Sequence, residues 1–459
     1  MPIFLGPLSE YFNPIKDPRQ PRYPDALRYS VPACLFTGIL LFLGRLGARR
    51  QIGLRLRTQA AAELFKTLFG CDGIPHGDTV NDLYSRLSVD KVQEKLTRFT
   101  EILIDRKVLY PWRLLDFYYC VAIDATGTLS FSKRHCPHCL TKKVHGKTVY
   151  YHNVLQASIV TPAGLVFPLL TEFIENPEED PAASEEKKKQ DCELKAFYRL
   201  SQRLDQRFPR LPMALLMDGL YAVGPVFDIC HRNGWKFFAS LSDDKLPSVN
   251  EEFQALARFH TGDPLVRKTG KDGAIQQVFR WANNIEYRDT AKRTHNLDVL
   301  ECHETKTISR DITTTTFRWV TNFSVDAKTA PVLANNGARL RWKVENETFN
   351  VQKNGGFELE HGYTYNENAT KIFHLMLQFA HVLAQLVEKG SLFRNAFPKG
   401  FGSSKNLAAE ILEAVRRIAL SAAHYARLVA TRIQIRFEHR APPNTIAAQI
   451  YVCTCPDTS

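Results

Sequence analysis

The segment YYCVAID, residues 118–124, is where the sequence changes from helical to strand-like patterning. Its unbroken apolar run has the length and composition of a strand that is buried on both faces of a sheet. Strand-like segments follow at residues 149–160 and 165–173, with Gly164 in the turn between them. Three strands in succession predict an antiparallel meander.

A second set of elements follows the meander. Residues 178–189 are charged and contain Pro181, which predicts a solvated loop. Apolar residues at helical spacing then predict a helix that Pro209 ends. The patterning further predicts a strand at 213–217, a helix near 225–232 and a strand at 235–241. This order of three strands, helix, strand, helix and strand matches an α/β fold with a mixed sheet of the ribonuclease H type.

The composition restricts the class of protein. Of 459 residues, 44% are hydrophobic and 24% charged, which is typical of a globular chain with more than one folding unit. Lys and Arg outnumber Asp and Glu by 60 to 48. The net charge of +12 favours a polyanionic partner, nucleic acid first and an acidic membrane surface second. The most apolar run, residues 29–44, is shorter than a membrane span, so no membrane insertion is expected.

Cysteine usage and the first residues bear on the cellular compartment. The ten cysteines fall singly or as close pairs in a long chain, which favours a reduced intracellular setting. Residues 1–24 are proline-rich and polar and show no signal pattern. We therefore expect a cytoplasmic location.

Three carboxylates occupy chemically suggestive places in this pattern. Asp124 and Asp218 each directly follow an apolar strand, and Glu345 lies on a basic, aromatic helix, RWKVE at residues 341–345. Mg²⁺ prefers carboxylate oxygens, and two Mg²⁺ ions can activate a nucleophile and neutralise charge in phosphoryl transfer. The sequence therefore predicts a phosphoryl-transfer site. Other acids that compete for these places are Asp116, Asp228, Asp243 and Asp244.

These carboxylates and the helix around Glu345 resemble the DDE transposases of the insertion sequence 4 group of bacterial mobile elements, over about residues 115–390. The resemblance implies a ribonuclease H-like core in which Asp124, Asp218 and Glu345 are catalytic and bind two Mg²⁺ ions. It implies cutting and rejoining of double-stranded DNA, both transposon ends and target. It also implies a homodimer on paired DNA ends and a cytoplasmic, nucleoid-associated location.

The same resemblance implies phosphate contacts near Glu345. The group's last motif places a Tyr, an Arg, the Glu and a Lys on one helix. Arg341 matches the Arg, but Ala338 stands at the Tyr position and Gln352 at the Lys position, with Lys353 one residue further on. Arg341 and Lys353 are the expected DNA contacts. The alternative for Arg341 is an ion pair with Glu345 one helical turn away.

Two aromatic residues precede that helix. Phe317 and Trp319 lie two apart on a predicted strand and therefore share one face. Transposases of this group can flip a base and stack it on an aromatic side chain, which makes both residues candidate DNA contacts. Core packing is the alternative and is expected for at least one of them.

A second metal site is suggested by HCPHC at residues 135–139. Cys136 and Cys139 form a Cys-x2-Cys half-site suited to structural Zn²⁺. The alternative is a pair of reduced thiols in a basic loop that contacts the DNA backbone. His152 is expected to be a packed core histidine. Candidates for the remaining zinc ligands are His145, Cys453 and Cys455.

The patterning divides the chain into five regions. They are a helical N-terminal DNA-binding region (1–110), the first part of the catalytic core (111–245), a β-rich insertion domain (246–312), the second part of the core (313–390) and a helical C-terminal region (391–459). Within the first region, short helices around a capped turn are compatible with helix-turn-helix DNA binding or with simple helical packing.

Three other interpretations stay open. A DNA-binding relative without catalysis is favoured by Ala338 and Gln352, which depart from the motif. A general ribonuclease H-like nuclease would cut DNA without end specificity. A zinc-dependent interaction module would depend on Cys136 and not on Glu345.

Overall fold

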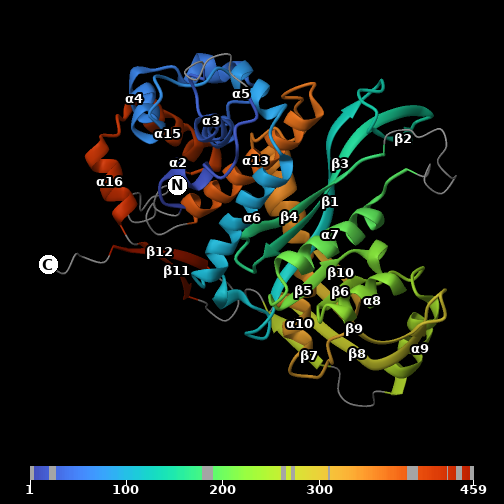
Figure 1. Cartoon of the computed structure of the whole chain (residues 1–459). Coiled ribbons are helices and arrows are strands. Elements are labelled where there is room, and N and C mark those ends of the chain that lie inside the picture. The colour runs from blue at the N-terminus through green and yellow to red at the C-terminus, as the bar shows by residue number, and fades with distance from the viewer. Residues whose placement is uncertain are drawn as a thin grey trace.

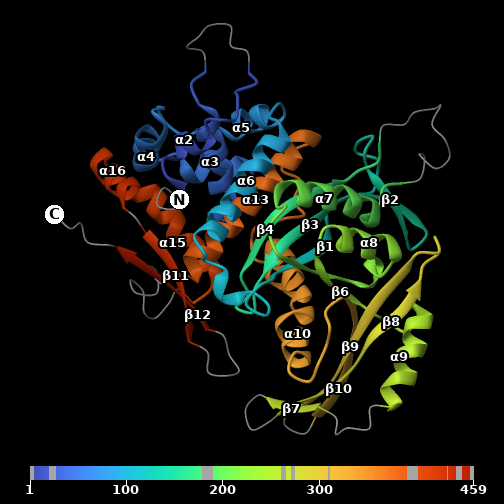
Figure 2. The ribbon, with the colours of Figure 1, turned by 60° about the horizontal axis from the view of Figure 1, so that its bottom comes forward.

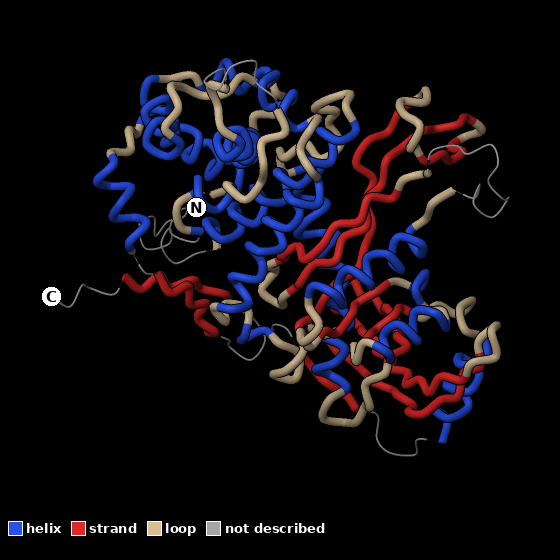
Figure 3. The backbone as a smooth tube through the Cα atoms, viewed as in Figure 1, coloured by secondary structure: helices blue, strands red, loops and turns tan. Residues whose placement is uncertain are grey.

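The computed structural model describes residues 5–19, 27–177, 190–259, 265–269, 274–308, 311–389, 402–431, 433–440 and 447–454. A mixed sheet runs through the molecule, and helices from both ends of the chain gather beside one end of it (Figure 1). Other helices, among them α7, α8, α9 and α10, lie along the sheet itself (Figure 3). The chain is a mixed α/β protein with helical N- and C-terminal regions, as the sequence predicts.

The N-terminal region is helical. It contains α2 (Leu8–Phe12), α3 (Val31–Leu43), a π-helical turn (Ile52–Leu56), α4 (Gln59–Phe69), α5 (Gly77–Tyr84), α6 (Val89–Asp105) and a 3-10 turn (Tyr110–Trp112). Ser30, Thr58 and Ser88 begin α3, α4 and α6 by accepting a backbone N–H bond at the helix start. The long helix α13 (Glu367–Glu388) packs against α3, α5 and α6 and also contacts the sheet (Figure 2).

The first half of the sheet contains the predicted meander. β1 (Tyr119–Phe131), β3 (Lys147–Val160) and β4 (Val166–Ile174) pair antiparallel, and β5 (Met213–Met217) and β6 (Lys236–Ser240) follow parallel to β1. The strand order is β4-β3-β1-β5-β6. The predicted helices are α7 (Glu193–Arg207) and α8 (Gly224–Arg232). The predicted loop 178–189 lies outside the described residues.

An arm that the sequence did not predict extends from the meander. β1 continues past Asp124 to Phe131, and β2 (Leu140–Val144) pairs with the first residues of β3. Between β2 and β3, His145 and Gly146 both have positive φ, 48° and 76°. Two such central residues form the tight hairpin turn that suits the twist of antiparallel strands. The arm exposes several basic side chains, namely Lys142, Lys143 and Lys147.

The β-rich segment extends the same sheet. β10 (Asp311–Thr321) pairs antiparallel with β6 and is followed by β9 (Thr294–Ile308), β8 (Ile275–Arg288) and β7 (Leu265–Thr269), with α9 (Pro247–Phe259) against β8 and α10 (Ala330–Asn336) after β10. Residues 276–281 and 284–288 belong to one strand, β8, with a bulge between Ala282 and Ile285. Asn284 takes a positive φ of 59° there.

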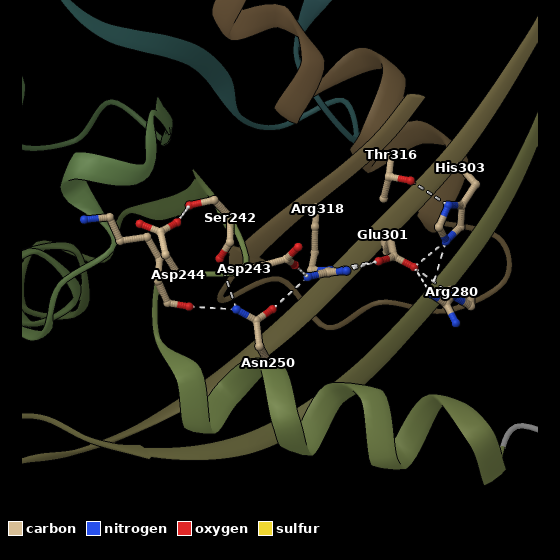
Figure 4. A network of polar contacts seen from close by, with 10 residues as sticks. Ser242, Asp243, Asp244, Asn250, Arg280, Glu301, His303, Thr316 and Arg318 are labelled. Carbon is tan, nitrogen blue, oxygen red and sulfur yellow. Dashed lines mark hydrogen bonds and ion pairs between the residues drawn. The ribbon is translucent and has the colours of Figure 1, made fainter. Parts of the chain in front are cut away.

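A buried ionic network holds this extension together (Figure 4). The Glu301 carboxylate is fully buried and accepts hydrogen bonds from Arg280 at 2.7 Å and from Arg318 at 2.8 Å. Arg318 also donates to Asp243 at 2.7 Å and to Asn250 on α9 at 2.9 Å. The network therefore links β8, β9, β10 and α9. Burial raises the pKa of Glu301, but these hydrogen bonds outweigh it and leave the pKa below its usual value.

The C-terminal region combines helices and strands. α15 (Ser404–Arg417) and α16 (Ala422–Ala430) are separate helices, because Ser421 begins the second one by capping it. β11 (Ile433–Arg440) pairs antiparallel with β12 (Ala447–Thr454), so the region expected to be helical also contains strands. No helix within the described ranges is long and apolar enough to cross a bilayer.

Candidate active site

Asp124 lies within a strand, not at its end. It occupies the middle of β1 and pairs with Gln156 on β3. The sequence placed it at a strand end because the apolar run stops there; β1 continues because Ala125–Phe131 still pairs with β3. The Asp124 side chain keeps 19% of its surface exposed. It is therefore accessible from the face of the sheet.

The register of the parallel strands brings Asp218 next to Asp124. Ala122 on β1 pairs with Leu216 on β5, so the residues two positions further on, Asp124 and Asp218, come opposite each other. Asp218 directly follows β5, as predicted, and its Oδ1 accepts a hydrogen bond from the Leu220 N–H at 2.8 Å. This bond fixes the turn that aims the carboxylate.

Glu345 reaches the same area from a helical segment with mixed geometry. The segment comprises a 3-10 turn (Ala338–Arg341), α11 (Trp342–Val344), a π-helical turn (Glu345–Asn350) and α12 (Val351–Asn354). Glu345 is exposed and begins the π-helical turn. π-helical turns are rare and occur frequently at functional sites.

The charges of Asp218 and Glu345 both act on Asp124. Burial, together with these two negative charges, raises the pKa of Asp124 to about 6, although Arg341 and the Ala125 N–H oppose the rise. The nearest guanidinium nitrogen of Arg341 lies 3.4 Å from Asp124 Oδ2. Arg341 therefore pairs with Asp124 across the site, not with Glu345 along the helix.

The two residues near the expected Lys position have different environments. Gln352 is fully buried and donates a hydrogen bond to Gln378 on α13 at 2.9 Å. Lys353 is partly exposed and pairs with Glu360 at 2.8 Å. Gln352 thus anchors the helical segment to α13 and is not available to a ligand. Only Lys353 is accessible to a phosphate.

Glu193 is a fourth carboxylate near the site that the sequence analysis missed. It is the first residue of α7, and Asn153 on β3 donates a hydrogen bond to it at 3.5 Å. Burial and the charge of Asp218 raise its pKa. A carboxylate in the first turn of a helix usually has only a local electrostatic role, so the sequence alone gave no signal.

The predicted aromatic contacts pack differently from each other. The rings of Phe317 and Trp319 stack 5.9 Å apart, which confirms that they share a face. Trp319 is only 5% exposed and belongs to the core, so it is not placed to stack on a base. Phe317 is partly buried, with the Arg339 guanidinium 4.5 Å above its ring. Trp342, beside Arg341, is instead 43% exposed.

Three of the four acidic residues that compete for these places in the sequence interact with other side chains. Asp228 pairs with Arg293, and Asp243 pairs with Arg318 at 2.7 Å. Asp244 accepts a hydrogen bond from Ser242 at 2.5 Å. Asp116 is exposed in the turn before β1, with a positive φ of 56°. The charged groups that act most on Asp124 are Arg341, Asp218 and Glu345.

The cysteine pair has a partner that the sequence analysis assigned to the core. His152 Nε2 lies 3.3 Å from Cys136 Sγ and 3.5 Å from Cys139 Sγ. Burial lowers the pKa of His152 and raises the pKa of the Cys136 thiol to about 12. His145 is exposed at the tip of the arm. Cys455 lies outside the described residues, and for Cys453 only its place in β12 is described.

The spacing of ligand atoms distinguishes the two groups. Across the described ranges, the only set of at least three His, Cys, Asp or Glu side chains with ligand atoms all within 4.8 Å of one another is Cys136, Cys139 and His152. Asp124, Asp218 and Glu345 are more widely spaced. No protein-family model and no curated protein matches this chain.

Proposed function

We propose that this chain is a DDE transposase that cuts and joins the ends of a mobile DNA element by Mg²⁺-dependent phosphoryl transfer. The observation that carries the proposal is that the negative charges of Asp218 and Glu345 both act on Asp124 and raise its pKa. These residues are 94 and 127 positions apart in sequence (218 − 124 and 345 − 218). A packing role does not require three carboxylates to converge, because like charges repel one another.

The strand order supports a ribonuclease H-like core. Three antiparallel strands followed by two strands parallel to the first, in the order β4-β3-β1-β5-β6, agree with the order read from the sequence. In this arrangement β1 and β5 are neighbours, and their carboxylates share one region of the sheet. The β-rich segment then returns the chain through β10 to the helical segment of Glu345.

The donor set fits Mg²⁺. Asp124, Asp218 and Glu345 offer only hard oxygen ligands. The pKa of Asp124 is raised chiefly by burial and in part by the negative charges of Asp218 and Glu345, which a cation would neutralise. These three residues would hold the ions, with Glu193 as a further oxygen ligand or as a partner of a bound water. When bound, two Mg²⁺ ions supply nucleophile activation and charge neutralisation.

The remaining side chains provide binding and orientation. Arg341, next to Asp124, can hold a phosphate oxygen of the strand to be cut. The exposed Trp342 ring can stack on a base displaced from the duplex, and Lys343, 4.5 Å over that ring, adds positive charge.

The proposed chemistry has two reactions. In the first reaction a water oxygen bonds to phosphorus and the DNA 3′-oxygen leaves. In the second, that 3′-hydroxyl oxygen bonds to the phosphorus of another phosphodiester, whose own 3′-oxygen leaves.

The partners follow from the proposed reaction. The net charge of +12 suits double-stranded DNA, and the basic arm adds a phosphate-binding surface beside the core. Joining two element ends requires both in one complex, so we propose a homodimer on the DNA. A nucleoid-associated location in a bacterial cytoplasm follows from that substrate.

A cleavage assay on the DNA that flanks the gene tests the proposal. Inverted repeats at the two sides would define the substrate, and Mg²⁺-dependent nicking at their outer ends is the expected result. Asp124→Asn, Asp218→Asn and Glu345→Gln should each bind this DNA and fail to cut it. Asp116→Asn, the matched control, should cut normally. Equal cutting of arbitrary duplexes would indicate a general nuclease, and cutting by all three variants would refute the assigned site.

A further inference from the structure

The base of the arm contains a preorganised group of two thiols and an imidazole. Cys136 and Cys139 are 7% and 1% exposed, and their sulphur atoms lie 3.4 Å apart. That separation is much longer than the bond of about 2.05 Å in a disulfide. His152 on β3 faces both sulphurs from the neighbouring strand, with Nε2 at 3.3 and 3.5 Å.

These separations match a tetrahedral zinc site. Zn–S bonds of about 2.3 Å and Zn–N bonds of about 2.0 Å place two sulphurs about 3.8 Å apart and a sulphur and a nitrogen about 3.5 Å apart. The observed distances of 3.4, 3.3 and 3.5 Å differ from these values by only a few tenths of an ångström. A small outward movement of the side chains would therefore admit the ion.

The backbone around the thiols is held in place independently. Asn176, just after β4, donates its side-chain amide to the Cys139 carbonyl at 2.8 Å and its backbone N–H to the His138 carbonyl at 3.2 Å. The Cys139 N–H in turn points to the Cys136 carbonyl at 3.5 Å. These contacts fix the turn that aims both sulphurs at one point, so the site requires little reorganisation on metal binding.

A cavity beside the group leaves room for a fourth ligand. It has a volume of about 50 Å³ and is lined in part by His135, His152, Glu175 and Glu367. The rest of its lining is mainly apolar, but a cavity of this size can hold a water molecule where such polar side chains face it. We propose that Cys136, Cys139 and His152 bind one Zn²⁺ ion, with water as the fourth ligand. The ion fastens the connection between β1 and β2 to β3 and so fixes the base of the arm.

This site is separate from the carboxylates. His152 lies opposite Leu129, five residues along β1 from Asp124, or ~17 Å at the rise of an extended strand. Soft thiolate ligands select Zn²⁺, whereas the carboxylates select Mg²⁺. Zinc binding and DNA cleavage can therefore be tested independently.

Metal analysis of the full-length protein, purified under reducing conditions with stoichiometric Zn²⁺ and then freed of excess metal, tests the proposal. We expect one zinc per chain, and its loss in Cys136→Ser, Cys139→Ser and His152→Gln. The exposed Cys192 lies outside the group, so Cys192→Ser is the matched control and should keep its zinc.

A second measurement does not depend on whether those variants fold. Co²⁺ added to the metal-free wild-type protein should give the visible bands of a tetrahedral thiolate site, and chelation of zinc should speed tryptic cleavage within the arm. A wild-type protein that takes up neither Zn²⁺ nor Co²⁺ overturns the proposal. So does full zinc content in both cysteine variants, or a Cys136–Cys139 disulfide in freshly purified protein.

Discussion

Asp124→Asn should stabilise the metal-free protein at neutral pH, although it should abolish cleavage. Burial and neighbouring negative charge raise the pKa of Asp124 from 3.8 to about 6, which means that the fold disfavours the ionised carboxylate. This shift corresponds to about 3 kcal/mol of destabilisation at a pH above both values. The attraction of Arg341 is already part of that net effect. An amide has nearly the same shape and removes the charge.

The pH dependence gives the sign of this effect. Because the pKa of Asp124 is raised in the folded state, that state binds the proton more tightly than the unfolded state does. The destabilisation caused by the ionised carboxylate therefore disappears as the pH falls through 6 and below 3.8. Equilibrium unfolding in urea, with EDTA present, should show Asp124→Asn more stable than wild type at pH 7.5 and equal to it near pH 3.5. Asp116→Asn should match wild type at both pH values. A less stable Asp124→Asn protein at pH 7.5 would refute the reasoning.

Other predictions follow from the same structure. Trp342→Ala should weaken binding of the element's terminal DNA by about 1–3 kcal/mol without lowering the melting temperature of the protein. Trp319→Ala, in the core, should instead lower the free energy of unfolding by about 3–5 kcal/mol. The reverse pattern would show that Trp319 binds DNA and that Trp342 packs in the core. Glu193→Gln should weaken Mg²⁺-dependent cleavage about 10–100-fold, with recovery at higher Mg²⁺ concentration, and an unchanged Mg²⁺ dependence would exclude Glu193 from the site. Glu301→Gln should cost about 3–5 kcal/mol in urea unfolding because it leaves buried arginines without their counter-charge. The lowered pKa of Glu301 means that the stabilisation is present above its ordinary value of 4.5 and is lost as the pH falls below it; the exposed Glu286→Gln is the control and should change neither quantity.

The core of the fold was predictable because its strands are buried on both faces. The apolar run 213–217 predicts β5 with its observed bounds, because a short apolar run between Pro212 and Asp218 is typical of a buried strand. Ala125–Phe131 alternates polar and apolar residues, which is a weaker strand signal than an unbroken apolar run. The second half of β1 was therefore not predicted. Asn283 and Asn284 look like a turn, but a bulge accommodates them within β8.

The candidate site was predictable where a carboxylate directly follows a strand. Asp218 is the clear case. Glu193 was missed because its relation to Asp218 depends on the packing of α7 against the sheet. His152 was assigned to the core because both of its cysteine partners lie in the connection between β1 and β2, and their approach to β3 depends on the fold. Fixed helical periodicity also failed near Glu345, where the π-helical turn changes the spacing of side chains.

Anomalous X-ray scattering from Mn²⁺ most directly tests the central claim that Asp124, Asp218 and Glu345 form one divalent-metal site. Mn²⁺ takes the same oxygen ligands as Mg²⁺ and can be located without reference to activity. In crystals of the protein with its terminal DNA, the peaks should be coordinated by these three carboxylates and the bound phosphate. Mn²⁺ bound elsewhere on the protein, with no peak at Asp124 and Asp218, would contradict the account.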